Sequence, residues 1–419
     1  MEKSIHKPRV VIIGAGFGGI FCAKGLVGSN SHITIIDKQN HHLFQPLIYQ
    51  VATGFLGIND VALPIRSLFR GKENIDIVMS EVTGIDTKNQ LVLTNNHSYE
   101  YDYLVIGTGA HYHFFGNDNW QPNVKVLKTL ADAISLRQQI LMAFEKAEIE
   151  TDVTIRRTLL TFVVIGGGPT GVEMAGAIAD VINYALKYEF RNIRRHDARI
   201  VLLEAADRVL GGMRKSLSQY TKKILEKKGV EVHCNKTVQD ILPNKIITKD
   251  ETIEAETILW AAGVRANNAA SWLGLPAAKN GGVLVKDDLS VEGFTNIFVI
   301  GDNSCLMKKD RPLPALASVA KQQGKYMAKV LNEKLDGREY KKPFRYLDMG
   351  TMSTIGRNSA VAQFKIFIIK GWLAWMMWGV VHIFFLTGFR NRITVFLTWS
   401  WTYLTYGIGS RIILKNPKK

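Results

Sequence analysis

Two glycine-rich stretches of the sequence each follow an apolar run and lead to an acidic residue. VVIIGAGFGG at residues 10–19 precedes Asp37, and TFVVIGGGPTG at residues 161–171 precedes Glu204. Glycines allow a tight bend and a close approach of backbone to phosphate, and the N-terminus of the following helix offers unpaired N–H groups to a pyrophosphate. The acid can accept hydrogen bonds from ribose hydroxyls. The two stretches therefore predict two dinucleotide sites.

Each predicted site needs a strand, a turn and a helix to position it. We expect buried strands at 9–13 and 161–165, a helix opening after each turn, and a second strand ending at each acid. The gap from Gly171 to Glu204 is longer than usual and contains a basic insertion, NYALKYEFRNIRRHDAR. The later strand NIFVIGDNS, at 296–304, returns the chain to its first unit. This internal repeat predicts an α/β fold with two Rossmann-type dinucleotide-binding domains.

Two nucleotides in one chain suit a redox relay in which one cofactor is held and the other visits. A nicotinamide gives up a hydride, which a flavin can accept and pass on as electrons. The first site is completed by the later segment that carries Asp302 and is the candidate for FAD. The second site is the candidate for NADH. Glu204 would repel a 2′-phosphate and so favours NADH, although Arg208 nearby leaves NADPH open. We expect a split FAD-binding domain at 1–115 and 266–335, an NADH-binding domain at 116–265, and a C-terminal membrane-anchoring region at 336–419.

The formal net charge of +16 is concentrated near the C-terminus. No Asp or Glu follows Asp348, whereas these basic residues do: Arg357, Lys365, Lys370, Arg390, Arg392, Arg411, Lys415, Lys418 and Lys419. Five of the 8 tryptophans lie in the same region. Basic residues beside tryptophan-rich apolar runs suit an anionic lipid surface, so we expect a membrane partner and no nucleic acid.

Two C-terminal segments, 371–389 and 393–410, contain no Lys, Arg, Asp or Glu. Asn391, Thr394, Thr398, Thr402 and Thr405 recur at helical spacing along the second segment and form a polar stripe. We therefore favour monotopic attachment by helices lying in the interface, and keep a spanning hairpin as the alternative. The chain is expected on the cytoplasmic face of the cell's inner membrane. A homodimer is left open.

The sequence resembles the type II NADH:quinone oxidoreductases, the single-subunit alternative NADH dehydrogenases. The resemblance spans nearly the whole chain, and its most specific parts are HHLFQPLIYQVATG at 41–54 and the tail GWLAWMMWGVVHIFFLTGFRNRITVFLTWSWTYL. It implies noncovalent FAD, NADH as donor, a membrane quinone as acceptor and no proton pumping. The FAD residues it implies are Gly14, Gly16, Gly18, Gly19, Asp37, Lys38, Val82, Gly109, Asp302, Ala317 and Lys370, and the NADH residues are Gly166, Gly168, Gly171 and Glu204.

The resemblance also implies two catalytic residues, Glu173 and Gln322. Glu173 lies just inside the second nucleotide helix, where the family's glutamate is tied to nicotinamide placement and proton handling; the alternative is an ordinary acid at a helix N-terminus. In the helix after Pro314 the chain has ASVAKQ where relatives commonly have AQxAxQ, so Ser318 stands at a usual glutamine position. We take Ser318, Gln322 and Gln323 as quinone-site candidates, with surface glutamines as the alternative for the last two.

Other functions remain to be weighed against this one. Dithiol reductases need paired cysteines beside the flavin, and Cys22, Cys234 and Cys305 form neither such a pair nor a metal site. An NADH-dependent reductase of a soluble acceptor would have no use for the apolar tail. A redox-responsive signalling flavoprotein would turn over slowly, which steady NADH oxidation by added quinone would distinguish.

Overall fold

The structure, a computed structural model, describes residues 7–405 and 409–413 and divides into two compact units. The first unit runs up to Leu43 and adds Ala62–His111 and Val264–Asp348, and the second holds Phe44–Val61, Tyr112–Gly263 and the chain from Met349. The expected FAD-binding stretch 1–115 thus differs at 112–115 and at 44–61, which belong to the second unit. There α2 (Ile48–Ala52) packs on α5 (Leu130–Ile149) and α7 (Pro169–Tyr188). Likewise, only 336–348 of the expected C-terminal region belongs to the first unit.

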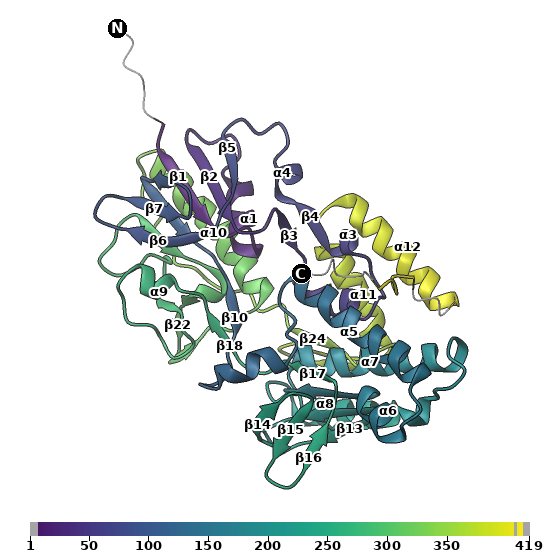
Figure 1. Cartoon of the computed structure of the whole chain (residues 1–419). Coiled ribbons are helices and arrows are strands. Elements are labelled where there is room, and N and C mark those ends of the chain that lie inside the picture. Colours follow the sequence, from purple (N-terminus) through teal and green to yellow (C-terminus); the bar gives the residue numbers. More distant parts are fainter. Residues whose placement is uncertain (1–6, 406–408, 414–419) are drawn as a thin grey trace. The chain divides into compact units, whose positions relative to one another are not determined.

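A five-stranded parallel sheet forms the centre of the first unit, in the order β20-β9-β1-β2-β5; β1, β2 and β5 are labelled in Figure 1. Alternate residues of β1 face two different hydrophobic clusters: Val10 and Ile12 one, Val11 and Ile13 the other. Both faces of the sheet are therefore covered, as expected for a parallel sheet. Its strands are β1 (Arg9–Ile13), β2 (His32–Asp37), β5 (Ile75–Met79), β9 (Tyr103–Ile106) and β20 (Ile297–Val299).

Helices α1 (Phe17–Gly25) and α10 (Ala317–Leu335) lie side by side over one face of this sheet (Figure 1). They approach so closely that a Cβ on Gly324 would stand 2.1 Å from the Gly18 carbonyl oxygen. Glycine therefore brings the later helix against the first nucleotide turn.

The second unit repeats the architecture of the first with a four-stranded parallel sheet in the order β13-β12-β11-β17. Its strands are β11 (Thr161–Ile165), β12 (Arg199–Leu203), β13 (Val230–His233) and β17 (Thr257–Trp260). Each unit also contains a three-stranded antiparallel meander. In the first unit it consists of β6 (Val82–Asp86), β7 (Leu91–Thr94) and β8 (Ser98–Glu100) and precedes β9; in the second it consists of β14 (Val238–Leu242), β15 (Lys245–Thr248) and β16 (Thr252–Glu254) and precedes β17. Both meanders shift register near the start, between Val82 and Gly84 and between Val238 and Asp240. The predicted repeat of two Rossmann-type units is confirmed.

Shorter elements complete the two units. The first unit also contains β3 (His41–Leu43), β4 (Ala62–Pro64), α4 (Ile65–Leu68), β10 (Ala110–Tyr112, whose last residue falls in the second unit), β18 (Val264–Ala266), α9 (Ala269–Trp272), β19 (Val283–Leu284), η4 (Gly301–Asn303), β21 (Ser304–Cys305), β22 (Met307–Lys308) and β23 (Arg311–Pro312). The second contains η1 (Gln45–Leu47), α3 (Ile58–Val61), η2 (Asp118–Asn123), α6 (Val153–Leu159), η3 (Arg195–Asp197) and α8 (Lys215–Lys227). Helix α5 begins with a capping box between Thr129 and Asp132.

The C-terminal part of the second unit is a three-stranded sheet followed by two helices. The strands β24 (Thr351–Thr354), β25 (Ala360–Gln363) and β26 (Ile368–Gly371) lead into α11 (Trp372–Phe385) and α12 (Phe389–Thr405), both yellow in Figure 1. Helix α11 is shorter than the uncharged segment 371–389: it begins after Gly371, whose φ is 82°, and ends at Phe385, and Gly388, with φ 90°, lies in the turn before α12. Among the described residues, none of the helices is both long and apolar enough to cross a membrane.

Candidate functional site

The first glycine turn joins β1 to α1 and leaves its helix N-terminus open. Gly14 has φ 98°, and a Cβ there would lie 2.3 Å from the Gly107 carbonyl oxygen, so the bend needs glycine. Gly19 packs on the turn itself, since its Cβ would lie 1.8 Å from the Gly14 oxygen. At Gly16, the N-cap, a Cβ would meet no described atom within 4 Å, and no described side chain caps the helix. The N-terminus of α1 can therefore face a pyrophosphate.

The second turn, between β11 and α7, has the same construction. Gly166 has φ 109° and lies against Ala261 and Ala262 of the chain after β17. A Cβ on Gly171 would lie 1.8 Å from the Gly166 oxygen, and a Cβ on Gly168 would meet no described atom within 4 Å. The two sites therefore offer the same backbone cradle.

Each acid is fixed by two backbone N–H groups, one of them from the glycine turn. Asp37 accepts from Ala15 at 2.6 Å and from Gln39 at 2.7 Å. Glu204 accepts from Gly167 at 2.5 Å and from Ala206 at 2.7 Å. Burial outweighs these two hydrogen bonds and raises the pKa of Asp37. The unusually long gap before Glu204 has not altered this arrangement, which leaves further carboxylate lone pairs for ribose hydroxyls.

Asp302 lies in η4, directly after β20, in a turn braced by Gln323. The Gln323 side chain is fully buried; its Oε1 accepts from the Gly301 N–H at 2.6 Å, and its Nε2 donates to Ser304 Oγ at 3.0 Å. Gln323, a quinone-site candidate from the sequence, is thus occupied in shaping the turn that carries Asp302.

Ser318 and Gln322, one helical turn apart on α10, hold the segment before Met349. Ser318 Oγ lies 3.0 Å from Tyr346 Oη. The Gln322 amide donates to the Leu347 carbonyl and accepts from the Leu347 N–H, each at 2.9 Å. The Leu347 side chain itself is exposed. The two candidates therefore share a helix face, as their spacing predicts.

Glu173 lies in the first turns of α7 and faces β24. Its carboxyl accepts hydrogen bonds from the Ser353 hydroxyl and the Thr354 N–H. Burial outweighs these bonds and raises the pKa of Glu173 to about 8. A carboxyl that is mostly protonated near neutral pH can donate or take up a proton there, which an exposed acid at a helix N-terminus would not do.

The remaining predicted FAD residues occupy varied surroundings. Val82 is buried in a core cluster of the first unit, and Lys38 is exposed just after Asp37. Gly109 has φ 72° with no described atom within 4 Å of its Cβ direction, and Ala317 is the first residue of α10. Lys370 belongs to the second unit, where its amine lies 5.3 Å from the centre of the Tyr220 ring.

Comparison with known proteins gives this geometry a family. A model of the pyridine nucleotide-disulphide oxidoreductase family matches residues 8–324. The type II NADH:quinone oxidoreductase Ndh of Mycobacterium tuberculosis is 40% identical over 423 residues, covering 97% of this chain and 90% of that protein. The chain belongs to the type II NADH:quinone oxidoreductases.

Solved structures show the same fold at lower identity. NDH2 from Plasmodium falciparum in complex with NADH has a TM-score of 0.86 at 21% identity and covers 98% of this chain and 100% of its own. The sulfide:quinone oxidoreductase of Aquifex aeolicus has a TM-score of 0.74 at 20% identity, with 92% of each chain covered. The fold of this type II NADH:quinone oxidoreductase is therefore that of a wider group of reductases.

The disulphide in the family's description has no counterpart in the described part of this oxidoreductase, where all three cysteines are free. Cys22 is fully buried in α1, and burial raises its pKa to about 12. Such a thiol resists ionisation and is a poor nucleophile. Among the described residues no cluster of His, Cys, Asp or Glu could hold a metal.

Sequence reasoning missed a polar network beside the first turn. Thr108 Oγ1 donates to Asn303 Oδ1 at 2.9 Å, Asn303 Nδ2 donates to the Asn267 carbonyl, and Asn267 Nδ2 donates to the Thr108 carbonyl at 2.7 Å. The network connects the turn at residues 107–110, GTGA, which follows β9, to η4. Thr and Asn directly after apolar strands were the available signal.

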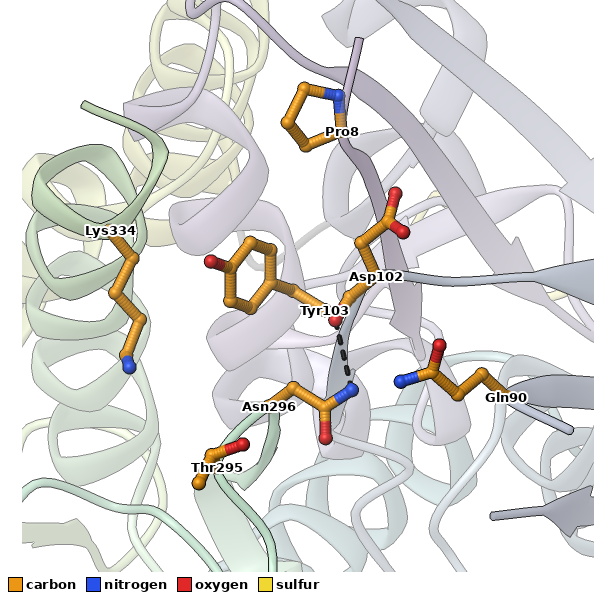
Figure 2. A pocket seen from close by; sticks show the side chains of 7 residues that line it. All are labelled: Pro8, Gln90, Asp102, Tyr103, Thr295, Asn296 and Lys334. Atoms are coloured by element: carbon orange, nitrogen blue, oxygen red, sulfur yellow. Dashed lines mark hydrogen bonds between the residues drawn. The ribbon is translucent and has the colours of Figure 1, made fainter. Parts of the chain in front are cut away.

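A shallow pocket of about 450 Å³ lies at the opposite edge of the first sheet (Figure 2). Its lining includes Pro8, Tyr103 and Asn296, which precede or begin β1, β9 and β20, and the Asn296 amide donates to the Asp102 carbonyl at 3.0 Å. Nucleotides bind at the carboxyl ends of parallel strands, so this pocket at the amino ends is not the dinucleotide site.

Proposed function

We propose that this chain oxidises NADH through bound FAD and passes the two electrons to a membrane quinone, with one nucleotide in each glycine turn. The observation that carries this proposal is the repeated cradle. Both turns lead into a helix N-terminus, and each turn donates one of the two backbone N–H groups that fix its acid, a construction that fits a pyrophosphate and an adjoining ribose.

FAD is assigned to the first unit. The glycines that would face its pyrophosphate are Gly14, Gly16, Gly18 and Gly19. Asp37 would face its ribose, and Asp302 would face the part of the cofactor next to η4. When bound, the flavin supplies the chemistry that accepts a hydride and releases electrons singly or in pairs. Lys38, Val82, Gly109, Ala317 and Lys370 complete the proposed set.

NADH is assigned to the second unit, on Gly166, Gly168, Gly171 and Glu204. Because the Glu204 carboxylate is held in place by two N–H groups, it cannot easily turn away from a 2′-phosphate. We therefore expect NADH to be preferred over NADPH.

Glu173 is proposed to place the nicotinamide and to hold a proton close to it. Its raised pKa supports this role, because the carboxyl can be neutral when an uncharged, reduced nicotinamide is present. Formation of a quinol consumes protons, and a carboxyl that titrates near neutral pH can store one of them.

The quinone is proposed to approach the face of α10 that carries Ser318 and Gln322. Both side chains now hold Tyr346 and Leu347. A quinone oxygen could take the place of the Leu347 carbonyl as the acceptor for the Gln322 amide. Gln323 is assigned instead to the support of Asp302.

Membrane attachment is proposed through the exposed faces of α11 and α12. These faces carry large apolar side chains: Trp372, Leu373, Met376, Val380 and Phe384 on α11, and Phe389, Ile393, Phe396, Leu397, Trp401 and Leu404 on α12. Burying each in lipid would contribute about 2 kcal/mol. The expected polar stripe of α12 is divided: Asn391 is buried and bonds to the Asn59 and Asp60 carbonyls, whereas Thr394 is exposed.

The basic residues contribute to lipid binding unequally. Arg390 is exposed and can meet anionic headgroups on the cytoplasmic face. Arg411 bonds to Glu189 and lies 5.4 Å from the centre of the Tyr184 ring, which reduces its availability. Lys415, Lys418 and Lys419 lie outside the described residues.

The absorption spectrum of purified, FAD-loaded protein tests the proposed reaction. NADH should bleach the flavin bands, and added quinone should restore them. Loaded protein that NADH fails to bleach would end the proposal. Restoration by a soluble acceptor but never by a quinone would favour the reductase of a soluble partner.

Vesicle flotation tests the attachment. The triple variant Phe384→Ser/Leu397→Ser/Leu404→Ser should leave anionic vesicles and lose reduction of a long-chain quinone, while NADH still bleaches the flavin. The matched control is Ile149→Ser/Val153→Ser, two exposed apolar residues outside these helices. Equal flotation of both variants would place the attachment elsewhere.

A further inference from the structure

A series of hydrogen bonds runs from β24 to helix α12 within the second unit. Thr354 Oγ1 lies 3.1 Å from Tyr49 Oη, and Gln50 Nε2 donates to the same phenol oxygen at 3.0 Å. The other end of the Gln50 amide, Oε1, accepts from Trp399 Nε1 at 2.7 Å. Tyr49 and Gln50, which are adjacent in the short helix α2, thus connect β24 with α12, and both of these elements lie far from α2 in the sequence.

Three members of the series are buried, and Trp399 is partly buried. Thr354 is 2% exposed, Tyr49 6% and Gln50 8%. Buried polar groups are costly when unpaired, so each member depends on its neighbours for satisfaction. The loss of one bond is therefore expected to disturb the next one along.

The strand end of the series holds the Glu173 carboxyl. Thr354, which meets Tyr49 through its hydroxyl, donates its N–H to Glu173, and Ser353 donates its hydroxyl. Burial and the nearby Glu173 charge both raise the pKa of Tyr49. Thr354 therefore contacts both the proposed catalytic carboxyl and the series that ends on α12.

We propose that Tyr49 and Gln50 are positioning residues: through them, the position of helix α12 determines where Ser353 and Thr354 place the hydrogen-bond donors of Glu173. This inference rests on the proposed roles of Glu173 and α12. Helix α12 also presents an apolar face for lipid. The same series of hydrogen bonds therefore connects the helix proposed to contact the membrane with the Glu173 carboxyl.

Few charged side chains lie on the elements that face Glu173, so its hydrogen-bond donors are the main influence on its protonation. Helix α2 and strand β24 contain no Asp, Glu, Lys or Arg, so Tyr49 is the titratable side chain that they contribute. Farther along α7, Asp180 is paired with Lys228, the residue that follows α8, at 2.6 Å and accepts the Arg357 N–H. A shift of Ser353 and Thr354 would therefore act on Glu173 directly.

Trp399→Phe is the mildest test, because it removes the indole N–H and keeps an aromatic ring beside Trp378, 5.3 Å away between centres. In FAD-loaded enzyme without NADH, the carbonyl stretch of protonated Glu173 can be followed by infrared difference spectroscopy and assigned by its loss in Glu173→Gln. We expect its titration midpoint to move to higher pH by several tenths of a unit, because the carboxylate loses donors.

Tyr49→Phe breaks the series at a second point and should give the same shift. The double variant Tyr49→Phe/Trp399→Phe should shift no further than either single variant, since the two bonds act in series. The matched control is Trp120→Phe in the same unit, where a buried indole N–H donates to Asp240 at 2.8 Å. It should leave the midpoint unchanged.

The outcomes separate this inference from the role of Glu173. An unmoved midpoint in both Tyr49→Phe and Trp399→Phe, or an equal shift in Trp120→Phe, would overturn the positioning role. If Glu173→Gln leaves the rate of flavin reduction unchanged, the proposed role of Glu173 fails. The infrared titration would still decide the link, because it reads protonation without turnover.

Discussion

Replacing Glu173 by Gln should change how the stability of the protein depends on pH. Its folded pKa of about 8 lies above the usual glutamate value of about 4.5, so between these two pH values the native protein binds a proton that the unfolded chain has already released. The sign follows: stability is fully present below about pH 4.5 and falls as pH rises towards 8. One pKa unit corresponds to about 1.4 kcal/mol. At pH 7, about 2.5 pH units above the usual value, the cost is therefore at most about 3.4 kcal/mol, and less where water reaches the carboxyl.

The assay is thermal unfolding of FAD-loaded wild type and Glu173→Gln from pH 5 to pH 8. The amide keeps the shape of the side chain and one acceptor for the Thr354 N–H, so the two Tm values should be close at pH 5. The variant should become the more stable protein as pH rises, with a difference of a few degrees at pH 8. Parallel Tm curves across this range would refute the raised pKa and, with it, the stored proton.

Three further substitutions test the proposed NADH site and the proposed quinone site. Gly171→Ala places a Cβ 1.8 Å from the Gly166 oxygen and should weaken NADH binding at least tenfold while FAD is retained, which titration of flavin bleaching measures. Glu204→Gln should raise the KM for NADH about tenfold and lower the preference over NADPH, as steady-state rates with both donors would show; an unchanged preference would remove Glu204 from the ribose site. Gln322→Ala should raise the KM for quinone and leave bleaching by NADH unchanged, and a slowed bleaching step would argue against its assignment to the quinone.

The repeated unit could be predicted from sequence because its signals are local. An apolar run such as RVVII, the glycines after it and the acid ending the next strand are all set by neighbouring residues. The same holds for Glu204, whose contact with the Gly167 N–H survives a long insertion because strand pairing of β11 and β12 fixes it.

The surroundings of α10 could not be predicted, because they depend on distant contacts. Gln322 and Gln323 are adjacent in sequence, yet one holds Leu347 and the other is buried against Gly301. Helical geometry places them on different faces, but only the close packing of Gly324 on α1 decides which face is covered. The same limit applies to Tyr49 and Gln50, whose partners Thr354 and Trp399 lie about 300 residues or more along the chain.

Comparison of the two copies explains why only one carries a glutamate after its turn. Gly19 and Gly171 are equivalent, so the position of Glu173 corresponds to Phe21 in the first copy. Helix α1 packs on α10, and there Phe21 lies under the amine of Lys321, 4.7 Å from the ring centre. Helix α7 instead packs on β24, whose Ser353 and Thr354 offer hydrogen-bond donors that a carboxyl can use. The partner packed against each helix therefore determines whether this position serves packing or chemistry.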